Sequence, residues 1–278
     1  MAINQAISGP CWLAKDPSKR WTEVFFLAYS PFWIIWALVL LVPFQLYEYC
    51  GNYGYMLIGL SCAAPTIVLP LFFLRCKADR GKPIWQRYWV KANIWIAIFS
   101  FIGNYFWTHY FYKVLGASYT FVSWRLNDVP ITLYLMTHGY FCFYHALSNI
   151  LLRRVQTGLA KSSRLVRWSA MALVVFLLSY ATAYAETLTI AHFPYYTFVD
   201  RDRMYTVGSL FYAIYFFVSF PMFYRMDEYP QKRGSKWTST EAALDALAAG
   251  MLVTILLDLW RISLGAIVDI KDQGLPWM

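Results

Sequence analysis

The run VFFLAYSPFWIIWALVLLVPFQL, from Val24 to Leu46, contains no charged side chain. A helix needs about 20 apolar residues to cross the hydrocarbon core of a bilayer, so this run is long enough to span one. Because lipid offers no hydrogen bonds, a spanning segment must satisfy its own backbone groups, and a helix does so without a partner strand. The run therefore predicts a transmembrane helix.

Comparable runs without Lys or Arg recur through the 278 residues. Hydrophobic residues make up 59% of the chain and charged residues 14%, a balance that is typical of integral membrane proteins. We predict an all-α fold, a polytopic transmembrane helical bundle of about seven spans in a single membrane domain. The predicted spans cover residues 24–46, 53–74, 92–112, 129–152, 168–190, 204–224 and 242–259.

Lys and Arg are distributed unevenly between the predicted loops. With alternating spans, 18 of them fall on the side of the N-terminal tail and 6 on the opposite side. The positive-inside rule then places the N-terminus in the cytoplasm and the C-terminus across the membrane. Because the net charge of +9 comes from these loops, it predicts contact with anionic membrane lipid rather than with nucleic acid.

The cysteines and histidines indicate no metal site and no disulfide framework. The cysteines are odd in number and form no CxxC motif, so we expect them to be packing residues. They are Cys11, Cys50, Cys62, Cys76 and Cys142. His138 and His145 would lie roughly 10 Å apart along one helix, too far to share a metal ion without other ligands. We expect neither a metal nor a cofactor.

Three ionisable side chains inside predicted spans are candidates for chemistry, because such groups are costly in lipid. His109, Glu186 and Asp258 lie near the same ends of the third, fifth and seventh spans. A carboxyl group that is buried without a cation keeps its proton, which suits Glu186 to proton donation. Structural alternatives stay open: a backbone hydrogen bond for His109, a bond to another helix for Glu186, and an ion pair with Arg261 for Asp258.

The fourth predicted span carries a polar stripe of His138, Cys142, His145 and Asn149 at helical spacing. Because these side chains share one face, that face is expected to meet protein rather than lipid. Hydrogen bonds between packed helices are the alternative to a functional role for the two histidines.

Aromatic residues gather around His109. Anchoring at the membrane interface explains many aromatics in such proteins. The density found here also suits a flat apolar ligand that passes through a positively charged state, because aromatic faces attract cations. The residues concerned are Trp107, Tyr110, Tyr119, Phe121 and Trp124.

The run NYFWTHYFYKVLGASYTFVSWRLNDVP, from Asn104 to Pro130, closely resembles the cycloeucalenol cycloisomerase family. Further matches span nearly the whole chain and lie at Pro17–Trp21, Asp79–Arg80, Arg87–Asn93, Phe193–Tyr196, Phe198–Arg201, Leu210–Tyr215, Phe220–Met222, Arg225–Glu228 and Met251–Arg261. The chain departs from the usual family pattern at Val122, Arg125, Leu126, Asp128, Ile131 and Leu133. A role for the histidine that the family carries at position 131 therefore has no counterpart here.

The resemblance implies a sterol isomerase that converts cycloeucalenol to obtusifoliol by opening a 9β,19-cyclopropane ring, without a cofactor. An acid protonates the cyclopropane methylene, a tertiary cation forms at C9, and a base removes the proton at C8. A dry site prevents water from trapping the cation. The resemblance also implies a cyclopropyl sterol substrate and the endoplasmic reticulum membrane, where sterols are made.

Within this reaction we predict Glu186 as the proton donor and His109 as the base or its relay. The two roles are interchangeable at this stage, and Asp258 is expected to orient or tune the pair. Trp107 and Trp124 are expected to flank the cation.

The sterol is expected to arrive sideways from the bilayer. Its 3β-hydroxyl should meet Asn127, Asp128 or Tyr119 near the interface while the rings descend between helices. The full set of predicted substrate-binding residues is Trp107, Tyr119, Phe121, Trp124, Asn127, Asp128 and His138.

The tetrapeptide Tyr-Thr-Phe-Val occurs twice on the charge-poor side, at Tyr119–Val122 and at Tyr196–Val199. A parallel duplication of two helical hairpins is one interpretation, and chance aromatic similarity is the other. A duplication would place His109 and Glu186 at equivalent depths.

Three other classes of membrane protein are alternatives to the isomerase. A seven-helix receptor is disfavoured because the N-terminus is predicted inside, and no Lys within a predicted span is available for a retinal Schiff base. Buried His, Glu and Asp also suit a proton-coupled transporter. A non-catalytic sterol-binding membrane protein is the third alternative.

Overall fold

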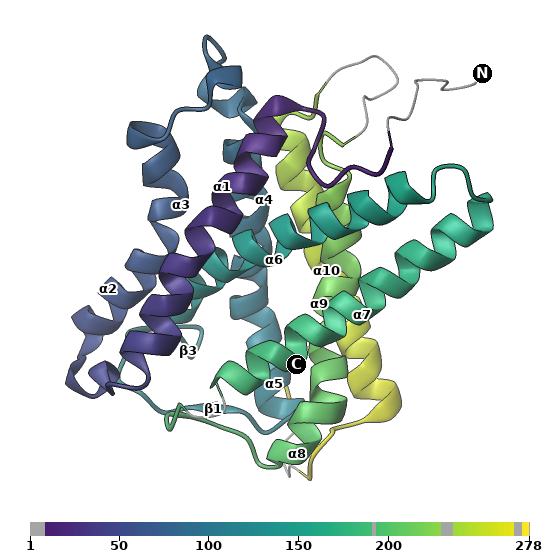
Figure 1. The fold of residues 1–278 in the computed structure, drawn as a ribbon. Coiled ribbons are helices and arrows are strands. Elements are labelled where there is room, and N and C mark those ends of the chain that lie inside the picture. The colour runs from purple at the N-terminus through teal and green to yellow at the C-terminus, as the bar shows by residue number, and fades with distance from the viewer. Residues whose placement is uncertain (1–8, 191–192, 229–235, 270–273, 278) are drawn as a thin grey trace.

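The chain folds as a bundle of helices (Figure 1). A computed structural model describes residues 9–190, 193–228, 236–269 and 274–277. The helical elements are α1 (Pro17–Ile34), η1 (Ile35–Leu41), η2 (Leu46–Tyr49), α2 (Asn52–Ala63), α3 (Pro65–Val68), η3 (Leu69–Phe73), η4 (Lys77–Asp79), η5 (Ile84–Gln86), α4 (Tyr88–Ile102), η6 (Gly103–Trp107), α5 (Thr108–Val114), α6 (Ile131–Gly158), α7 (Arg164–Ile190), α8 (Arg201–Arg203), η7 (Met204–Gly208), α9 (Ser209–Tyr224) and α10 (Ser239–Leu264). The short strands are β1 (Ser118–Tyr119), β2 (Arg125–Leu126), β3 (Val129–Pro130) and β4 (Tyr196–Thr197).

Several helices are long and apolar enough to cross a membrane, which confirms the predicted all-α membrane bundle. Within the described residues they are Pro17–Leu41, Asn52–Phe73, Arg164–Ile190, Arg201–Tyr224 and Ser239–Leu264. The other two predicted spans are helical over residues 88–114 and 131–158 but are more polar. That these two also cross the membrane stays a prediction.

The two more polar helices lie at the centre of the bundle. Their polar side chains are tolerated there because they bond to protein instead of facing lipid. The amide of Asn93 on α4 accepts from the ring of His138 on α6 across 2.8 Å. His145 bonds through Nδ1 to the carbonyl of Phe141, 2.8 Å away. The helix-packing alternative is therefore the observed one for His138, whereas the bond of His145 lies within its own helix.

Several helices extend beyond the predicted spans into charged sequence. Helix α1 begins at Pro17, α4 at Tyr88, and α6 continues to Gly158, so Lys19, Lys91 and Arg153 lie inside helices. Both lysines lie outside the predicted spans, although Lys19 belongs to the helix Pro17–Leu41 that is long and apolar enough to cross a membrane. A buried charge is tolerated when it is paired, and each of these three has a carboxylate partner.

The first span ends earlier than predicted. The helix stops at Leu41, and Gln45 adopts a left-handed backbone with φ of 51°, which turns the chain before residue 46. Pro31 lies inside α1, where it offers no backbone N–H, and the chain continues as the wider π-helix η1 from Ile35.

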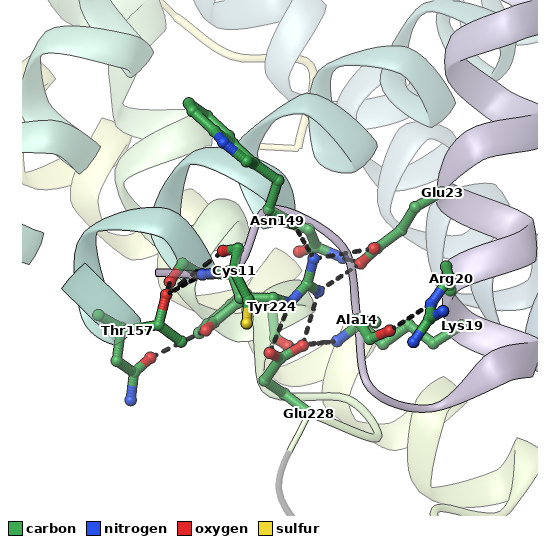
Figure 2. A network of polar contacts seen from close by, with 12 residues as sticks. Cys11, Ala14, Lys19, Arg20, Glu23, Asn149, Thr157, Tyr224 and Glu228 are labelled. Carbon is green, nitrogen blue, oxygen red and sulfur yellow. Dashed lines mark hydrogen bonds and ion pairs between the residues drawn. The ribbon is translucent and has the colours of Figure 1, made fainter. Parts of the chain in front are cut away.

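A cluster of paired charges joins helices at the N-terminal end of the bundle (Figure 2). Arg153 on α6 reaches Glu23 on α1 and Glu228 after α9, each at 2.7 Å. Lys19 lies 2.9 Å from the other oxygen of Glu228. Asn149 adds a bond of 3.0 Å to Glu23. Three chain segments that are distant in sequence are thus held by one neutral group of two cations and two carboxylates.

The cations of this cluster set the charge state of Glu228, which lies beyond the end of α9. Burial by itself would raise the pKa of Glu228, but Lys19 and Arg153 outweigh burial and hold the pKa below its ordinary value. Glu228 therefore stays ionised at neutral pH, and both cations keep their partner.

One buried and one partly exposed ion pair tie α4, α10 and the segment after α9 together at the same end. Lys91 pairs with Asp227, and Arg225 pairs with Asp245. The indole N–H of Trp95 donates to Asp245 across 3.0 Å. This end of the bundle is therefore closed by ion pairs as well as by apolar packing.

At the opposite end, the two Tyr-Thr-Phe-Val segments meet. Strands β1 and β4 pair antiparallel, with Tyr119 opposite Tyr196. Their rings stack at 4.2 Å between centroids and 5° between planes. The C-terminal segment also returns here, because the amide of Ile267 donates to the carbonyl of Val114 across 2.9 Å. Whether the two hairpins derive from a duplication stays a prediction.

The charged cluster yields a stability prediction. Replacing Arg153 with Ala leaves Glu23 and Glu228 sharing only Lys19, and breaking a buried pair costs about 3–5 kcal/mol. We expect a clearly lower Tm for Arg153→Ala in detergent micelles. Arg164→Ala, at an exposed position on α7, is the matched control and should leave Tm unchanged. Equal Tm values for the two variants would contradict the structural role of the cluster.

Candidate active site

A cavity of about 510 Å³ lies between α1, α2, α6, α7 and α9, with η6 and α5 forming one wall. Its volume falls within the range of about 300–1,000 Å³ that is common for sites of small molecules. The wall is mainly aromatic and aliphatic, and it includes Trp33, Phe111, Phe141, Phe143 and Phe193. A largely apolar molecule is therefore the ligand that this cavity suits.

Glu186 on α7 contributes its carboxyl group to the cavity wall. Atom Oε2 is buried and makes no hydrogen bond within the part of the chain that the structure describes. The hydroxyl groups of Tyr144 and Tyr212 face the carboxyl group. No described Lys or Arg forms an ion pair with it, in contrast to the paired carboxylates at the N-terminal end. A buried acid that faces a cavity without a cation is suited to proton transfer.

Tyrosines surround this carboxyl group. The side chains close enough to interact with its charge come from four parts of the chain: Tyr119 from β1, Tyr140 and Tyr144 from α6, Tyr196 from β4, and Tyr212 and Tyr215 from α9. All of them line the cavity. Among the described residues, phenol groups rather than charged side chains therefore surround the acid.

Tyr119 and Tyr196 close the end of the cavity that lies near the β1 and β4 loops. Burial raises the pKa of both phenols, so both remain neutral. The Arg125 guanidinium donates to the carbonyl of Tyr119, and the amide of Thr120 donates to the carbonyl of Tyr195 across 2.9 Å. This end of the cavity is thus covered by a loop pair that is hydrogen-bonded.

The cavity reaches the surface along α7. Ala181, Ala185 and Thr189 recur at four-residue steps, line the cavity and are exposed. They lie within a helix that is otherwise apolar on its outer face, with Leu177 and Leu188 exposed there. The exposed rim of the cavity therefore lies on the part of the surface that meets lipid.

Three of the π-helical elements bring residues to the cavity. Ala37 comes from η1, Gly103 and Asn104 come from η6, and Met204 comes from η7. A π-helical turn changes the direction of the side chains that follow it, and such turns are frequent at functional sites.

Of the predicted site residues, Glu186, Tyr119 and Phe121 line the cavity. Phe121 stacks on Tyr55 from α2 at 4.6 Å between ring centroids, which completes the same covered end. Tyr119 and Phe121 reach the cavity because the loop with the aromatic run folds over the end of the bundle, and their part in binding a sterol stays a prediction.

His109 is not among the residues that line the cavity, so the expected grouping with Glu186 is not formed. Its Nε2 lies 2.9 Å from the carbonyl of Asn127, and its ring packs on Tyr112 and Trp277. His109 and Glu186 were predicted at similar depths, but similar depth did not bring the imidazole and the carboxyl group together. The side chain of His109 leaves α5 on a face that does not line the cavity. The backbone hydrogen bond that was the alternative for His109 is the one observed.

Asp258 also lies away from the cavity lining. Its carboxylate accepts from Arg261 across 2.9 Å, as the ion-pair alternative expected, and from Tyr110 across 3.3 Å. Trp107 is buried between Phe99 and Tyr215, and its indole N–H donates to Thr254. Neither residue therefore occupies the position expected beside a bound sterol.

The remaining predicted binding residues support the scaffold instead of lining the cavity. Asn127 donates to the carbonyl of Tyr105, 2.7 Å away in η6. Asp128 is exposed and lies 3.7 Å from Arg125. Trp124 packs edge-on against Tyr53 near the surface, and His138 bonds to Asn93 as described.

The tyrosines of α6 and α9 were not among the predicted site residues. A signal was present, because Tyr140 and Tyr144 are four residues apart and Tyr212 and Tyr215 are three apart, so each pair shares one helix face. Both pairs lie inside apolar runs, where a phenol needs a hydrogen-bond partner or a polar cavity.

Comparison with known proteins adds one relative. The chain is 54% identical over 272 residues to the curated protein cycloeucalenol cycloisomerase of Arabidopsis thaliana, and the aligned region covers 96% of each chain. No family model matches the chain, and no solved structure matches it.

The isolation of Glu186 yields a prediction on stability. Because its carboxyl group has no cationic partner, Glu186→Gln removes no ion pair, and we expect Tm in detergent to be unchanged or higher. Glu23→Gln is the matched comparison, since it weakens the paired cluster and should lower Tm. A fall in Tm that is as large for Glu186→Gln would show that Glu186 is a structural group.

Proposed function

The chain belongs to the cycloeucalenol cycloisomerase family, and we propose that its cavity binds the cyclopropyl sterol and that Glu186 carries out the ring opening. The protein is a sterol isomerase, as predicted, because 54% identity extends over almost the full length of both chains. The observation that carries the assignment of Glu186 is its carboxyl group, which lines an aromatic cavity with a buried oxygen that has no hydrogen bond in the described structure.

The first step is proton transfer from the Glu186 carboxyl group to the cyclopropane methylene, C19. The electron pair of the C9–C19 bond forms the new C–H bond, so C19 becomes a methyl group and C9 becomes a tertiary cation. Relief of ring strain drives this step. General acid catalysis of this kind contributes about 10²–10⁴-fold to rate.

The second step is loss of the C8 proton, and the same carboxyl group takes it. After the first step Glu186 is a carboxylate beside the cation, and the lining contains no other Asp or Glu and no His, Lys or Arg among the described residues. The C8–H electron pair becomes the C8–C9 double bond, and Glu186 recovers its proton. The cycle is redox-neutral, and one acid replaces the pair of Glu186 and His109 that the sequence predicted.

The tyrosine faces lower the energy of the cation between the two steps. Tyr144, Tyr212 and Tyr215 come from helices on two sides of the acid, and an aromatic face stabilises a desolvated cation by about 2 kcal/mol or more. The apolar wall excludes water, which would otherwise add to C9.

The substrate reaches the cavity from the bilayer, between α1 and α7. The exposed rim of Ala181, Ala185 and Thr189 offers small side chains at the depth of the acyl chains. A sterol already dissolved in lipid then enters without crossing water.

The protein is an integral membrane protein, and we place it in the endoplasmic reticulum with its N-terminus in the cytoplasm. The charge imbalance of 18 to 6 between the two sides supports this orientation. Sterol synthesis supports the compartment. The covered end of the cavity, near Tyr119 and Tyr196, then faces the lumen.

The role of Glu186 is tested by sterol analysis of a host that accumulates cycloeucalenol. Expression of the unmodified chain should yield obtusifoliol, and Glu186→Gln should lower the rate by about 10²–10⁴-fold because the amide cannot donate the required proton. His109→Gln keeps an N–H donor for the carbonyl of Asn127 but removes the imidazole, so it should retain turnover within a few-fold. Full activity of Glu186→Gln, or loss of activity only in His109→Gln, would refute the single-acid assignment.

The route of the sterol is tested by adding bulk at the rim. Ala185→Trp narrows the opening along α7, so kcat/KM should fall on the order of tenfold, about 1.4 kcal/mol, while kcat changes less. Leu188→Trp is the matched control, because Leu188 is exposed on the same helix and does not line the cavity. Equal kinetics for the two variants would exclude access along this rim.

A further inference from the structure

Asn104 and Thr108 form a polar pair in an otherwise aromatic wall of the cavity. They lie four residues apart, so they share one face of the helix that runs through η6 and α5. Both line the cavity, and their exposed fractions are 6% and 9%. Buried polar groups that face a cavity need a partner there, because an unmade hydrogen bond costs about 1–3 kcal/mol.

The amide of Asn104 has a defined orientation. Its Nδ2 donates to the carbonyl of Ser100 across 2.9 Å, and because a carbonyl only accepts, the nitrogen must be the atom on that side. Atom Oδ1 is therefore the one left for a ligand, and it has no hydrogen bond among the described residues. The hydroxyl of Thr108 likewise has none in the described part of the chain.

Other hydroxyl groups along the wall already have partners. Thr132 donates to the carbonyl of Tyr55 across 2.8 Å, Thr187 to that of Ala183 across 3.0 Å, and Thr189 to that of Glu186 across 2.8 Å. Thr137 and Thr182 are lining threonines with no amide side chain one turn away on their own helices. Thr182 lies one turn from the carboxyl group of Glu186, which the proposed reaction uses. The pair on η6 and α5 thus combines an amide oxygen and a hydroxyl group that the proposed reaction does not use.

The segment that carries the pair is held from outside the cavity. Asn127 donates to the carbonyl of Tyr105, the residue after Asn104, and the carbonyl of Asn127 in turn lies 2.9 Å from His109 Nε2. Gly103 also matters, because a Cβ there would lie 2.9 Å from the ring of Trp107. These contacts fix the π-helical turn and hence the direction of Asn104.

We propose that Asn104 and Thr108 bind the 3β-hydroxyl group of the sterol. The hydroxyl proton is donated to Oδ1 of Asn104, and the hydroxyl oxygen accepts from Thr108, so both capacities of the ligand are used. Because C3 and C9 belong to one rigid ring system, this contact sets which carbon faces Glu186 on the other side of the cavity. The inference rests on the proposed function, and it replaces Asn127, Asp128 and Tyr119 as the site of the hydroxyl group.

The test is a binding measurement that does not depend on turnover. Glu186→Gln protein in detergent is titrated with radiolabelled cycloeucalenol and with its 3-deoxy analogue. We expect a preference for the hydroxylated sterol of roughly threefold to tenfold per hydrogen bond. Adding Asn104→Leu or Thr108→Val should weaken binding of the hydroxylated sterol by that factor, leave the 3-deoxy analogue unaffected, and so remove the preference.

Thr182→Val is the matched control, since it removes a lining hydroxyl from another helix, and it should keep the full preference. Thr108→Val replaces only the hydroxyl group with a methyl group, so it provides the test if Asn104→Leu does not fold. A preference that survives in both variants, or that disappears in Thr182→Val, overturns the inference. The binding measurement uses the Glu186→Gln chain and does not depend on isomerisation. Failure of the unmodified chain to isomerise the sterol would therefore refute the proposed function but not the binding of the 3β-hydroxyl group by Asn104 and Thr108.

Discussion

A polar group inside a membrane protein must find its partner within the protein, and this constraint organises the whole bundle. Lys19, Lys91 and Arg153 are buried near one end, and each is paired with a carboxylate. Glu186 is the contrasting case, because its nearest polar groups are phenols and its Oε2 has no bond among the described residues. Glu186 therefore lacks, among the described residues, the ionic partner that each of these three cations has.

The two ends of the bundle are closed by different interactions. At the N-terminal end, ion pairs hold α1, α4, α6, α9 and α10 together, so the helices cannot easily separate there. At the other end, the paired loops β1 and β4 cover the cavity with stacked tyrosines. The bundle is thus closed by ion pairs at one end, and the cavity is covered by aromatic loops near the other. The cavity is exposed along its side, at the rim on α7.

His109 and Asn127, which the sequence suggested as site residues, instead hold a helical turn that lines the cavity. His109 and Asn127 form a short chain of hydrogen bonds that ends at η6, which carries Asn104 into the cavity. The presence of His109 and Asn127 in the run from Asn104 to Pro130 therefore has a physical explanation, although neither residue lines the cavity. A sequence pattern indicates that the position of a residue is constrained. It does not distinguish a residue that contacts a ligand from a residue that holds the contacting residue in place.

The sequence by itself determined the helical membrane fold, the family and one acid, because apolar run length, charge placement and a long matching run are properties of the chain in order. Tyr119 and Phe121 were also found, since their loop could be identified locally. Only the tertiary structure decided that Glu186 faces Tyr212 and Tyr215 while His109 faces Asn127. The reason is rotational: depth along a helix follows from counting residues, whereas the direction of a side chain depends on π-helical turns and on how neighbouring helices pack.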